Sequence, residues 1–301
     1  MPIPQPNLAI TLLACLVALQ AVGQTTLPDS RPLAPAEDRS ADMVAGIDRF
    51  LTRATEDSLL HRSQHWKRVF DSSAAYVESI QPNRVRLRQI IGAVDPLASP
   101  VVLSFESGPD RAEVVAESDQ VTVYAVRWTV TEGIDAEGLW LEPHEAALAA
   151  VVAIPDADQT PESIAGLAGQ VEQAFALRLA TAGCRVLVPT LLDRSCRWSG
   201  SPVGGMTNLT HREWIWRQGI EFGRHPIGYE VLQVETAVHW LASRGAMPIG
   251  VAGYGEGGLL ALYSAAVNTQ IDAALVSGYF QSRQQLWSEP IYRNVFGLSL
   301  I

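Results

Sequence analysis

The spacing of hydrophobic and polar residues changes along the chain, and each change predicts a different kind of segment. Residues 8–22 are almost all apolar, whereas residues 24–41 are rich in Pro, Ser and Asp and show no period. Apolar side chains then recur three and four positions apart through residue 80, which predicts a helical N-terminal segment over residues 42–98. From residue 101 the period falls to two, which is typical of half-buried strands. A sheet-containing domain is therefore expected over residues 99–301.

Short, continuously apolar runs alternate with helical patterns in the second half of the chain. A run without polar interruptions is typical of a strand buried on both faces of a parallel sheet. The expected buried strands are residues 146–154, 184–189, 248–252 and 271–277, and the expected helices are residues 163–182, 211–217, 229–242 and 259–266. Alternating runs ahead of them predict antiparallel lead-in strands at residues 101–105, 121–130 and 138–141. The predicted fold class is α/β, with a mostly parallel sheet and flanking helices.

The apolar run near the N-terminus has the length of a signal-peptide core and is shorter than a membrane span. We expect residues 1–23 to be a signal peptide, residues 24–41 to be a linker, and the mature protein to be exported, either periplasmic or extracellular. The alternative is a lipid anchor at Cys15, whose preceding residues resemble a lipoprotein acylation box. Once Cys15 is removed, Cys184 and Cys196 remain. They could form a disulfide, but two buried free thiols are the simpler prediction.

Composition narrows the classes of function. With 48% hydrophobic and 18% charged residues, the chain is expected to be globular. Its net charge of −10 argues against non-specific binding to nucleic acid or to an anionic membrane, because both need an excess of Lys and Arg on one face. His61 and His65 lie one helical turn apart, but no third metal ligand is near them in the sequence. We therefore expect no nucleic-acid partner, no stable membrane span, and neither a metal nor a cofactor.

A glycine-rich turn between the expected strand 248–252 and the expected helix 259–266 carries the strongest functional signal. It reads Gly253-Tyr254-Gly255-Glu256-Gly257-Gly258. Small residues two before and two after a central position are typical of the nucleophile elbow, the G-x-S-x-G turn of α/β-hydrolases. Gly255 takes the place of the nucleophile and has no side chain to attack with. The backbone N–H of Glu256 is still expected where such a turn builds half of an oxyanion hole.

Two other interpretations of this turn stay open. Gly253, Gly255 and Gly258 also match G-x-G-x-x-G, which predicts a dinucleotide-binding loop. Such a loop needs an acidic residue at the end of the next strand, and here that strand ends in the residues Val-Ser-Gly-Tyr at 276–279. Alternatively, the glycines serve only to let the strand and the helix pack closely. The elbow is the favoured interpretation.

Charged and aromatic side chains on the expected loops are the candidate substrate-binding residues. The candidates are Asp156, Asp158, Arg194, Trp198, Arg212, Arg224 and His225. The first four follow buried strands, and α/β proteins bind ligands at the carboxyl ends of such strands. The last three belong to a basic and aromatic stretch that suits a carboxylate or a sugar acid. The alternative is structural, because loop aspartates commonly cap turns and the arginines could pair with neighbouring glutamates.

The chain resembles an exported bacterial branch of the α/β-hydrolases that is similar to dienelactone hydrolases and acetyl xylan esterases. Four runs carry the resemblance: PDADQTPE (155–162), HREWIWRQGIEFGRHPIGYE (211–230), GYGEGG (253–258) and VSGYFQSRQQLWSEPIYRNVFGL (276–298). The resemblance covers about residues 80–298. It implies an α/β-hydrolase fold and a small-molecule ester, lactone or sugar-derived ligand.

The order of the catalytic triad bears on activity. In this fold the acid and the histidine follow the nucleophile, on loops after later strands. Only one expected strand follows the glycine turn, so both positions are expected beyond Ile301, and the sheet is expected to lack its C-terminal strands. Two functions therefore remain: an ester or lactone hydrolase, and a non-catalytic protein of the same fold that binds a ligand over Gly255.

Overall fold

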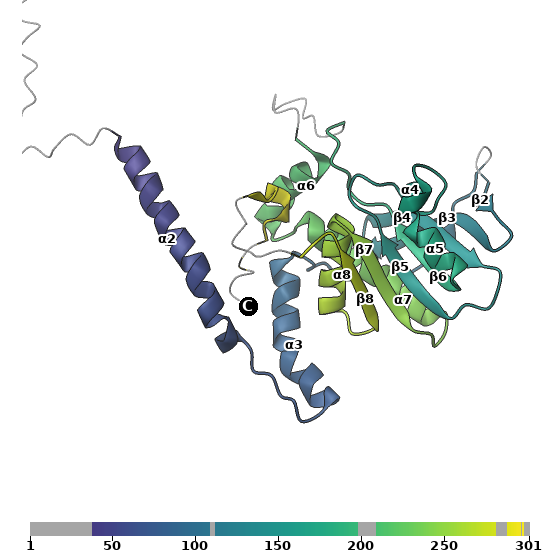
Figure 1. Cartoon of the computed structure of the whole chain (residues 1–301), viewed down its shortest axis with the longest axis horizontal. Coiled ribbons are helices and arrows are strands. Elements are labelled where there is room, and N and C mark those ends of the chain that lie inside the picture. Colours follow the sequence, from purple (N-terminus) through teal and green to yellow (C-terminus); the bar gives the residue numbers. More distant parts are fainter. Residues whose placement is uncertain (1–37, 109–111, 198–208, 281–287, 296, 298–301) are drawn as a thin grey trace, which may run out of the picture. The chain divides into compact units, whose positions relative to one another are not determined.

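The computed structural model describes residues 38–108, 112–197, 209–280, 288–295 and 297 (Figure 1). The chain divides into two compact units, residues 1–51 and 52–301. The described part of the first unit belongs to α2 (Arg39–His61), a helix that continues across the division. Within the described ranges, no helix combines the length and the apolar character that a membrane crossing requires. The expected signal peptide, Cys15 and nearly all of the expected linker lie outside these ranges, so export stays a prediction.

The helical N-terminal segment is not continuous. After α2 and a short 3-10 turn, η1 (Arg62–His65), residues 66–72 leave the helical conformation, and α3 (Ser73–Ile90) begins a second helix. Ser72 starts this second helix, because its Oγ accepts the N–H of Ala75 at 3.1 Å and so caps α3. Pro82 lies inside α3, which continues past it to Ile90. The prediction of uninterrupted helical spacing up to residue 80 was therefore wrong at this junction.

In the part of the chain that the structure describes, the central sheet has eight strands. They are β1 (Leu103–Phe105), β2 (Val114–Glu117), β3 (Val121–Thr131), β4 (Ile134–Pro143), β5 (Ala149–Ile154), β6 (Cys184–Pro189), β7 (Ile249–Tyr254) and β8 (Ala273–Ser277). Their order is β1-β3-β4-β6-β5-β7-β8, and β2 pairs with β3. Pairing is antiparallel from β1 to β6 and parallel through β6-β5-β7-β8. The predicted antiparallel lead-in and the parallel part that follows it are both confirmed, although β2 was not predicted.

Hydrophobic cores cover both faces of the sheet, as the continuously apolar runs predicted. Val152 of β5 and Leu187 of β6 belong to one core, with side chains of α7 (Pro226–Ser243) and α8 (Glu256–Val267). Ala153 and Val186, which point the other way along the same strands, belong to the second core, with α4 (Pro161–Ile164) and α5 (Phe175–Thr181). Because successive strand residues face opposite sides, a strand covered on both faces has few places for polar residues.

The expected helix 163–182 is divided. α4, the 3-10 turn η2 (Val171–Gln173) and α5 replace it, because Gly166 and Gly169 take left-handed conformations with φ of 77° and 76°. The remaining helical elements are α6 (His211–Gly219), η3 (Ile220–Phe222) and η5 (Ile291–Arg293). α7 begins at Pro226, three residues before the expected start, because the side chain of His225 caps it.

The strand expected at residues 271–277 is not buried. It forms β8, which pairs with β7 at one end of the sheet path, and Leu275 in it is 60% exposed. The apolar composition is that of a buried strand, but in the described part of the chain β7 is its only pairing neighbour. The two mature cysteines also differ from expectation: neither forms a disulfide within the described residues, but Cys184 is half-buried and Cys196 is exposed.

Candidate functional site

The turn after β7 has the sharp strand-to-helix form of an elbow. β7 ends at Tyr254 and α8 begins at Glu256, so Gly255 alone connects them. Its φ of 58° and ψ of −119° are strained for any residue with a side chain. The N–H of Gly255 donates to the carbonyl of Ser277 at 3.0 Å, and its own carbonyl accepts the N–H of Leu259 at 3.1 Å. The strained conformation that this turn imposes on a nucleophile is present, with glycine in it.

Two of the flanking glycines are required by close packing. A Cβ on Gly253 would lie 2.0 Å from the carbonyl oxygen of Gly257, and a Cβ on Gly257 would lie 2.2 Å from the carbonyl oxygen of Ile154. The start of α8 therefore rests directly on β5 and β7, with no side chain between them. This contact holds the backbone N–H groups of α8 at the carboxyl ends of the strands.

Asp156 occupies the space over Gly255. Its Oδ1 accepts the N–H of Glu256 at 2.7 Å, and a Cβ built on Gly255 would lie only 2.4 Å from the same oxygen. In an active elbow the N–H after the nucleophile stabilises the oxyanion of the reacting ester. Here a carboxylate of the chain itself accepts that N–H.

Arg194 holds Asp156 in this position. Its Nη1 donates to Oδ2 of Asp156 at 2.9 Å and its Nη2 to Oδ1 at 3.2 Å, while Nη1 also donates to Oδ2 of Asp158 at 2.6 Å. Burial acts to raise the pKa of Asp156, but the hydrogen bonds from Arg194 and from the Glu256 N–H outweigh burial and hold that pKa below its usual range. Asp156 is therefore a carboxylate at neutral pH.

Glu256 lies at the centre of the charged cluster. Its side chain is fully buried, and Oε1 accepts Nη2 of Arg194 at 3.3 Å and Nε of Arg293 at 2.5 Å. Its Oε2 is 3.8 Å from Nη2 of Arg212 and has no hydrogen-bond partner within the described residues. A carboxylate in the first turn of α8 is also stabilised by the N-terminal end of the helix dipole.

Arg212 and Glu230 form a buried, bidentate pair behind Glu256. Nη1 and Nη2 of Arg212 donate to the two carboxylate oxygens of Glu230 at 2.7 and 2.8 Å. Burial raises the pKa of Glu230, and its ion pair with Arg212 opposes that effect. The guanidinium also lies 5.2 Å from the ring centroid of Tyr292, whose hydroxyl accepts Nε of Arg194 at 2.9 Å. Each of the three cluster arginines, at positions 194, 212 and 293, thus faces at least two carboxylates.

The structure brings together four of the seven candidate substrate-binding residues, Asp156, Asp158, Arg194 and Arg212. Trp198 lies outside the described residues. Arg224 binds Asp95 through Nε and Nη2 at 2.8 and 2.6 Å, away from this cluster.

His225 is buried and has a structural environment. Its Nδ1 accepts the N–H of Ile227, which caps α7, and its Nε2 donates to the carbonyl of Asn294 at 3.1 Å. Burial is the main cause that lowers its pKa to about 4, so the ring is neutral at pH 7.

Ser195, His211 and Asp193 lie close together but do not form a catalytic relay. Oδ1 of Asp193 is 2.5 Å from Nδ1 of His211, and Oγ of Ser195 is 3.5 Å from that same nitrogen. A relay needs the acid and the nucleophile on opposite ring nitrogens. Among the described residues, no group of three His, Cys, Asp or Glu side chains could hold a metal ion.

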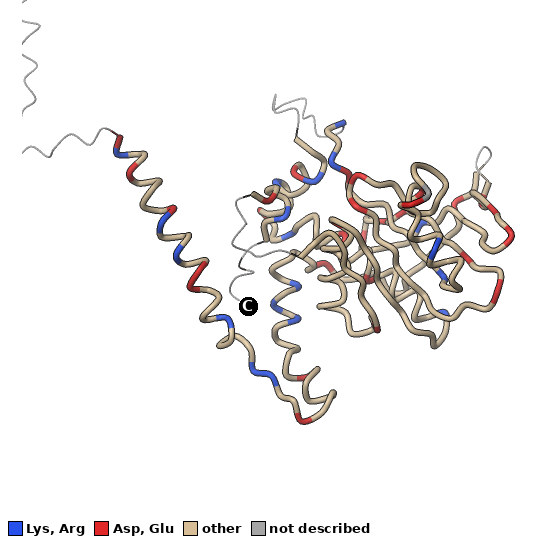
Figure 2. The backbone as a smooth tube through the Cα atoms, in the orientation of Figure 1, with Lys and Arg blue, Asp and Glu red and all other residues tan. Residues whose placement is uncertain are grey.

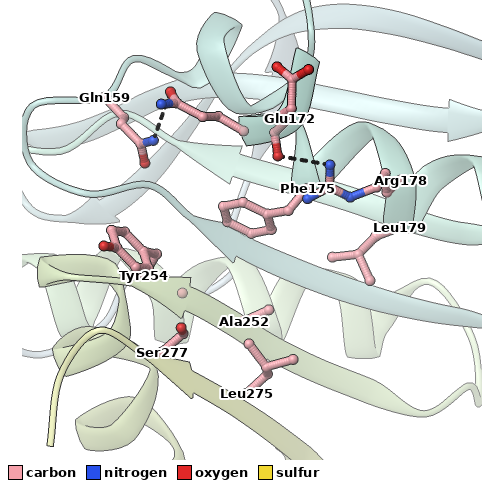
Figure 3. Close-up of a pocket in the computed structure, with 11 residues that line it drawn as sticks. Gln159, Glu172, Phe175, Arg178, Leu179, Ala252, Tyr254, Leu275 and Ser277 are labelled. Atoms are coloured by element: carbon pink, nitrogen blue, oxygen red, sulfur yellow. Dashed lines mark hydrogen bonds between the residues drawn. The ribbon is translucent and has the colours of Figure 1, made fainter. Parts of the chain in front are cut away.

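A cavity of about 600 Å³ lies beside the turn, between α5 and the ends of β7 and β8 (Figure 3). Phe175 and Leu179 of α5 line one side, and Tyr254 and Leu275 line the other. Polar groups at its margin belong to Gln159, Glu172, Gln173, Arg178 and Ser277. Its lining is mostly apolar, with a few polar groups that could orient a bound molecule.

Sequence reasoning missed two members of the charged cluster, Tyr292 and Arg293. Glu230 is one of the neighbouring glutamates with which the arginines were expected to pair as the structural alternative, and it does bind Arg212. Arg293 pairs with Glu256 across 37 residues of chain. No periodicity reports such a contact, because it depends on how the chain returns after β8.

Comparisons with known proteins find similarity in structure and no match in sequence. No protein-family model matches the sequence, and no curated protein matches it. A Bacteroides fragilis protein, named as a candidate acetyl xylan esterase, has a TM-score of 0.53 and 15% identity; the match covers 82% of this chain and 61% of that one. Acetyl xylan esterase 1 from Thermoanaerobacterium has a TM-score of 0.45 and 16% identity, with 72% and 64% covered. This chain therefore spans less than two thirds of the length of these proteins.

Of these two structures, the Bacteroides fragilis protein has a TM-score above 0.5. At such low identity this likeness identifies the fold and not the activity. The chain has the α/β-hydrolase fold that its sequence predicted.

Proposed function

We propose that this chain is a non-catalytic member of the α/β-hydrolase fold that binds a small, neutral ester or lactone in the cavity beside Gly255. The observation that carries the proposal is the carboxylate of Asp156, which accepts the N–H of Glu256 and fills the space of a nucleophile side chain. This is the second of the two functions that the sequence left open.

Two physical reasons argue against nucleophilic ester hydrolysis at the turn. Gly255 has no oxygen or sulfur that could form an acyl intermediate. The oxyanion position is also blocked, because a substrate carbonyl would have to displace an ionised carboxylate that Arg194 holds with two hydrogen bonds. A neutral carbonyl oxygen is a weaker acceptor than that carboxylate.

The cavity beside the turn supports the ligand-binding part of the proposal. Its volume of about 600 Å³ falls within the range of small-molecule sites. The rings of Phe175 and Tyr254 offer apolar contact to a flat molecule, and the hydroxyl of Ser277 offers a donor to a carbonyl oxygen. Its lining includes one arginine and one glutamate, which favours a neutral ligand over an ion.

Hydrolysis of p-nitrophenyl acetate tests the catalytic part. We expect the purified chain, Gly255→Ser and Asp156→Ala to release p-nitrophenolate at the rate of the buffer blank. Turnover by the unmodified chain that is lost in Asp156→Ala would overturn the proposal.

Saturation-transfer NMR with coumarin, a stable aromatic lactone, tests the binding part. We expect transfer to the unmodified chain and to Val115→Glu, whose side chain lies on β2 outside the cavity. Transfer should be lost in Leu275→Glu, which places a charge in the cavity. Equal transfer to Leu275→Glu and to the control, or no transfer to any of the three, would contradict this ligand class.

A further inference from the structure

A second cavity, of about 510 Å³, lies on another part of unit 52–301. It is formed by η1 and the residues after it, by α3 and α8, and by Tyr279 and Phe280 after β8. α3 packs against α8, so the cavity rests on two helices in direct contact. The residues that line it differ from those of the cavity beside Gly255.

The charges in this cavity are all positive. Arg62, Arg68 and Arg84 line it, and none of the described lining residues is acidic. This is unusual for a chain with a net charge of −10. Figure 2 shows further basic positions along α3, which carries Arg84, Arg86 and Arg88. An anion would therefore meet local attraction here, although the whole molecule repels it.

Two of these guanidinium groups have hydrogen-bonding capacity to spare. The Nε atoms of Arg62 and Arg84 are buried without a partner in the described part of the chain. Arg84 uses Nη1 on the carbonyls of Ala265 and Ala266 at the end of α8, which fixes its guanidinium at the cavity wall. Because these two atoms are closed off from the cavity, a ligand would meet the terminal nitrogens instead: among the described residues, Nη2 of Arg84 and both Nη atoms of Arg62 make no hydrogen bond, so they can donate to a bound acceptor. This distinguishes the cavity from the cluster at Glu256, where carboxylates of the chain already bind the arginines.

Aromatic side chains supply the remaining surface. Trp66, Tyr76, Tyr263 and Tyr279 line the cavity. The guanidinium of Arg68 lies 4.3 Å from the ring centroid of Trp66, which orients both groups. Such rings bind the flat face of another ring, while guanidinium groups bind a carboxylate with two parallel hydrogen bonds.

The segment that carries Arg62 and Trp66 is fastened to α3. Nδ2 of Asn83 donates to the carbonyl of His65 at 3.1 Å, and Oγ of Ser79 accepts the N–H of Val69 at 3.1 Å. The cavity wall is thus held before any ligand arrives, which reduces the entropy lost on binding.

We propose that this cavity binds a carboxylate attached to a ring, with Arg62 and Arg84 on the carboxylate and the aromatic side chains on the ring. The ring can be aromatic or that of an acidic sugar, because an aromatic side chain packs on a planar ring and also on the apolar C–H face of a sugar ring. The proposal does not depend on the function proposed for the Gly255 turn.

Isothermal titration calorimetry on the full chain tests it with two probes, ferulate for the aromatic ring and digalacturonate for the sugar ring. Methyl ferulate, which keeps the ring and lacks the charge, is the control ligand. We expect at least one of the two acids to bind the unmodified chain. The Arg62→Gln variant should bind the same acid about tenfold more weakly, because it loses a hydrogen bond between charged groups. Arg86→Gln, an exposed position on α3 outside the cavity, should bind like the unmodified chain.

Three results would overturn the proposal: no heat from either acid, equal binding of methyl ferulate and ferulate, or equal affinity of Arg62→Gln and Arg86→Gln. Unfolding is not expected to affect the comparison, because the side chain of Arg62 makes no hydrogen bond or ion pair within the described residues. Equal thermal midpoints of the two variants would confirm that they are matched. Binding of only one of the two acids shows whether the cavity takes an aromatic ring or a sugar ring.

Discussion

Replacing Gly255 by alanine should destabilise the chain far more than an ordinary glycine substitution at the surface. A side chain at its φ of 58° and ψ of −119° costs about 1–3 kcal/mol in backbone strain. The new Cβ would also lie 2.4 Å from Oδ1 of Asp156, so the carboxylate must leave the N–H of Glu256. A hydrogen bond to a charged group is worth about 1.5–3 kcal/mol, and the partial exposure of Asp156 favours the lower end. Together these terms predict a loss of about 3–4 kcal/mol.

Urea unfolding followed by tryptophan fluorescence measures this loss, and Gly223→Ala is the matched control. Gly223 also has a positive φ, 66°, but a Cβ there meets nothing within 4 Å, so only about 1 kcal/mol is expected. Asp156→Ala should remove the collision, so the double variant should be more stable than the sum of the two single losses predicts, by about 1 kcal/mol or more. Equal losses at Gly255 and Gly223, or strict additivity with Asp156→Ala, would refute the assignment of Asp156 to the space over the turn.

Three further predictions follow from the charged and buried groups. Because the pKa of Asp156 is lowered by folding, its carboxylate contributes stability above pH of about 4 and loses it as the pH falls further, so the deficit of Asp156→Asn in urea should shrink at pH 3. The pKa of His225 is lowered to about 4 from 6.5, so the unfolded chain binds the proton first between these values; stability should fall by about 3 kcal/mol as the pH drops through that window, and His225→Asn should flatten this slope. Arg212→Met should cost about 3–5 kcal/mol because it leaves Glu230 buried without its cation, and the double variant with Glu230→Leu should recover most of that loss in thermal unfolding.

The parts of the fold that the sequence predicts well are those where local pattern and burial agree. β5 is apolar throughout and β6 is apolar except for Arg185, so their runs identified them as strands covered on both faces. The prediction of one continuous helix over residues 163–182 was wrong because Gly166 and Gly169 adopt left-handed conformations, which the spacing of apolar residues does not indicate. For β8 the predicted strand is confirmed but its predicted burial is wrong, since the exposure of a strand depends on which elements lie beside it.

The sequence predicts only those site residues that follow a parallel strand, because the ends of such strands meet at one edge of the sheet. Asp156 and Arg194 follow neighbouring parallel strands, so their meeting could be expected. The sequence could not predict that Asp156 fills the space over Gly255, because this depends on the direction of the Asp156 side chain, which Arg194 sets. Arg293 joins through a return of the chain after β8, which no local signal encodes.

The short turn η5 (Ile291–Arg293) and the residue after it make hydrogen bonds to the charged cluster and to side chains next to it. Arg293 binds Glu256, the hydroxyl of Tyr292 accepts from Arg194, and the carbonyl of Asn294 accepts both His225 and the indole N–H of Trp216. Release of this one segment would remove a hydrogen bond from four separate groups at the same moment, and Trp216 and the Nε2 of His225 would lose the acceptor described for them. Its opening should therefore be cooperative, and a protease that cuts there would trap the chain with the buried face of Glu256 open to water.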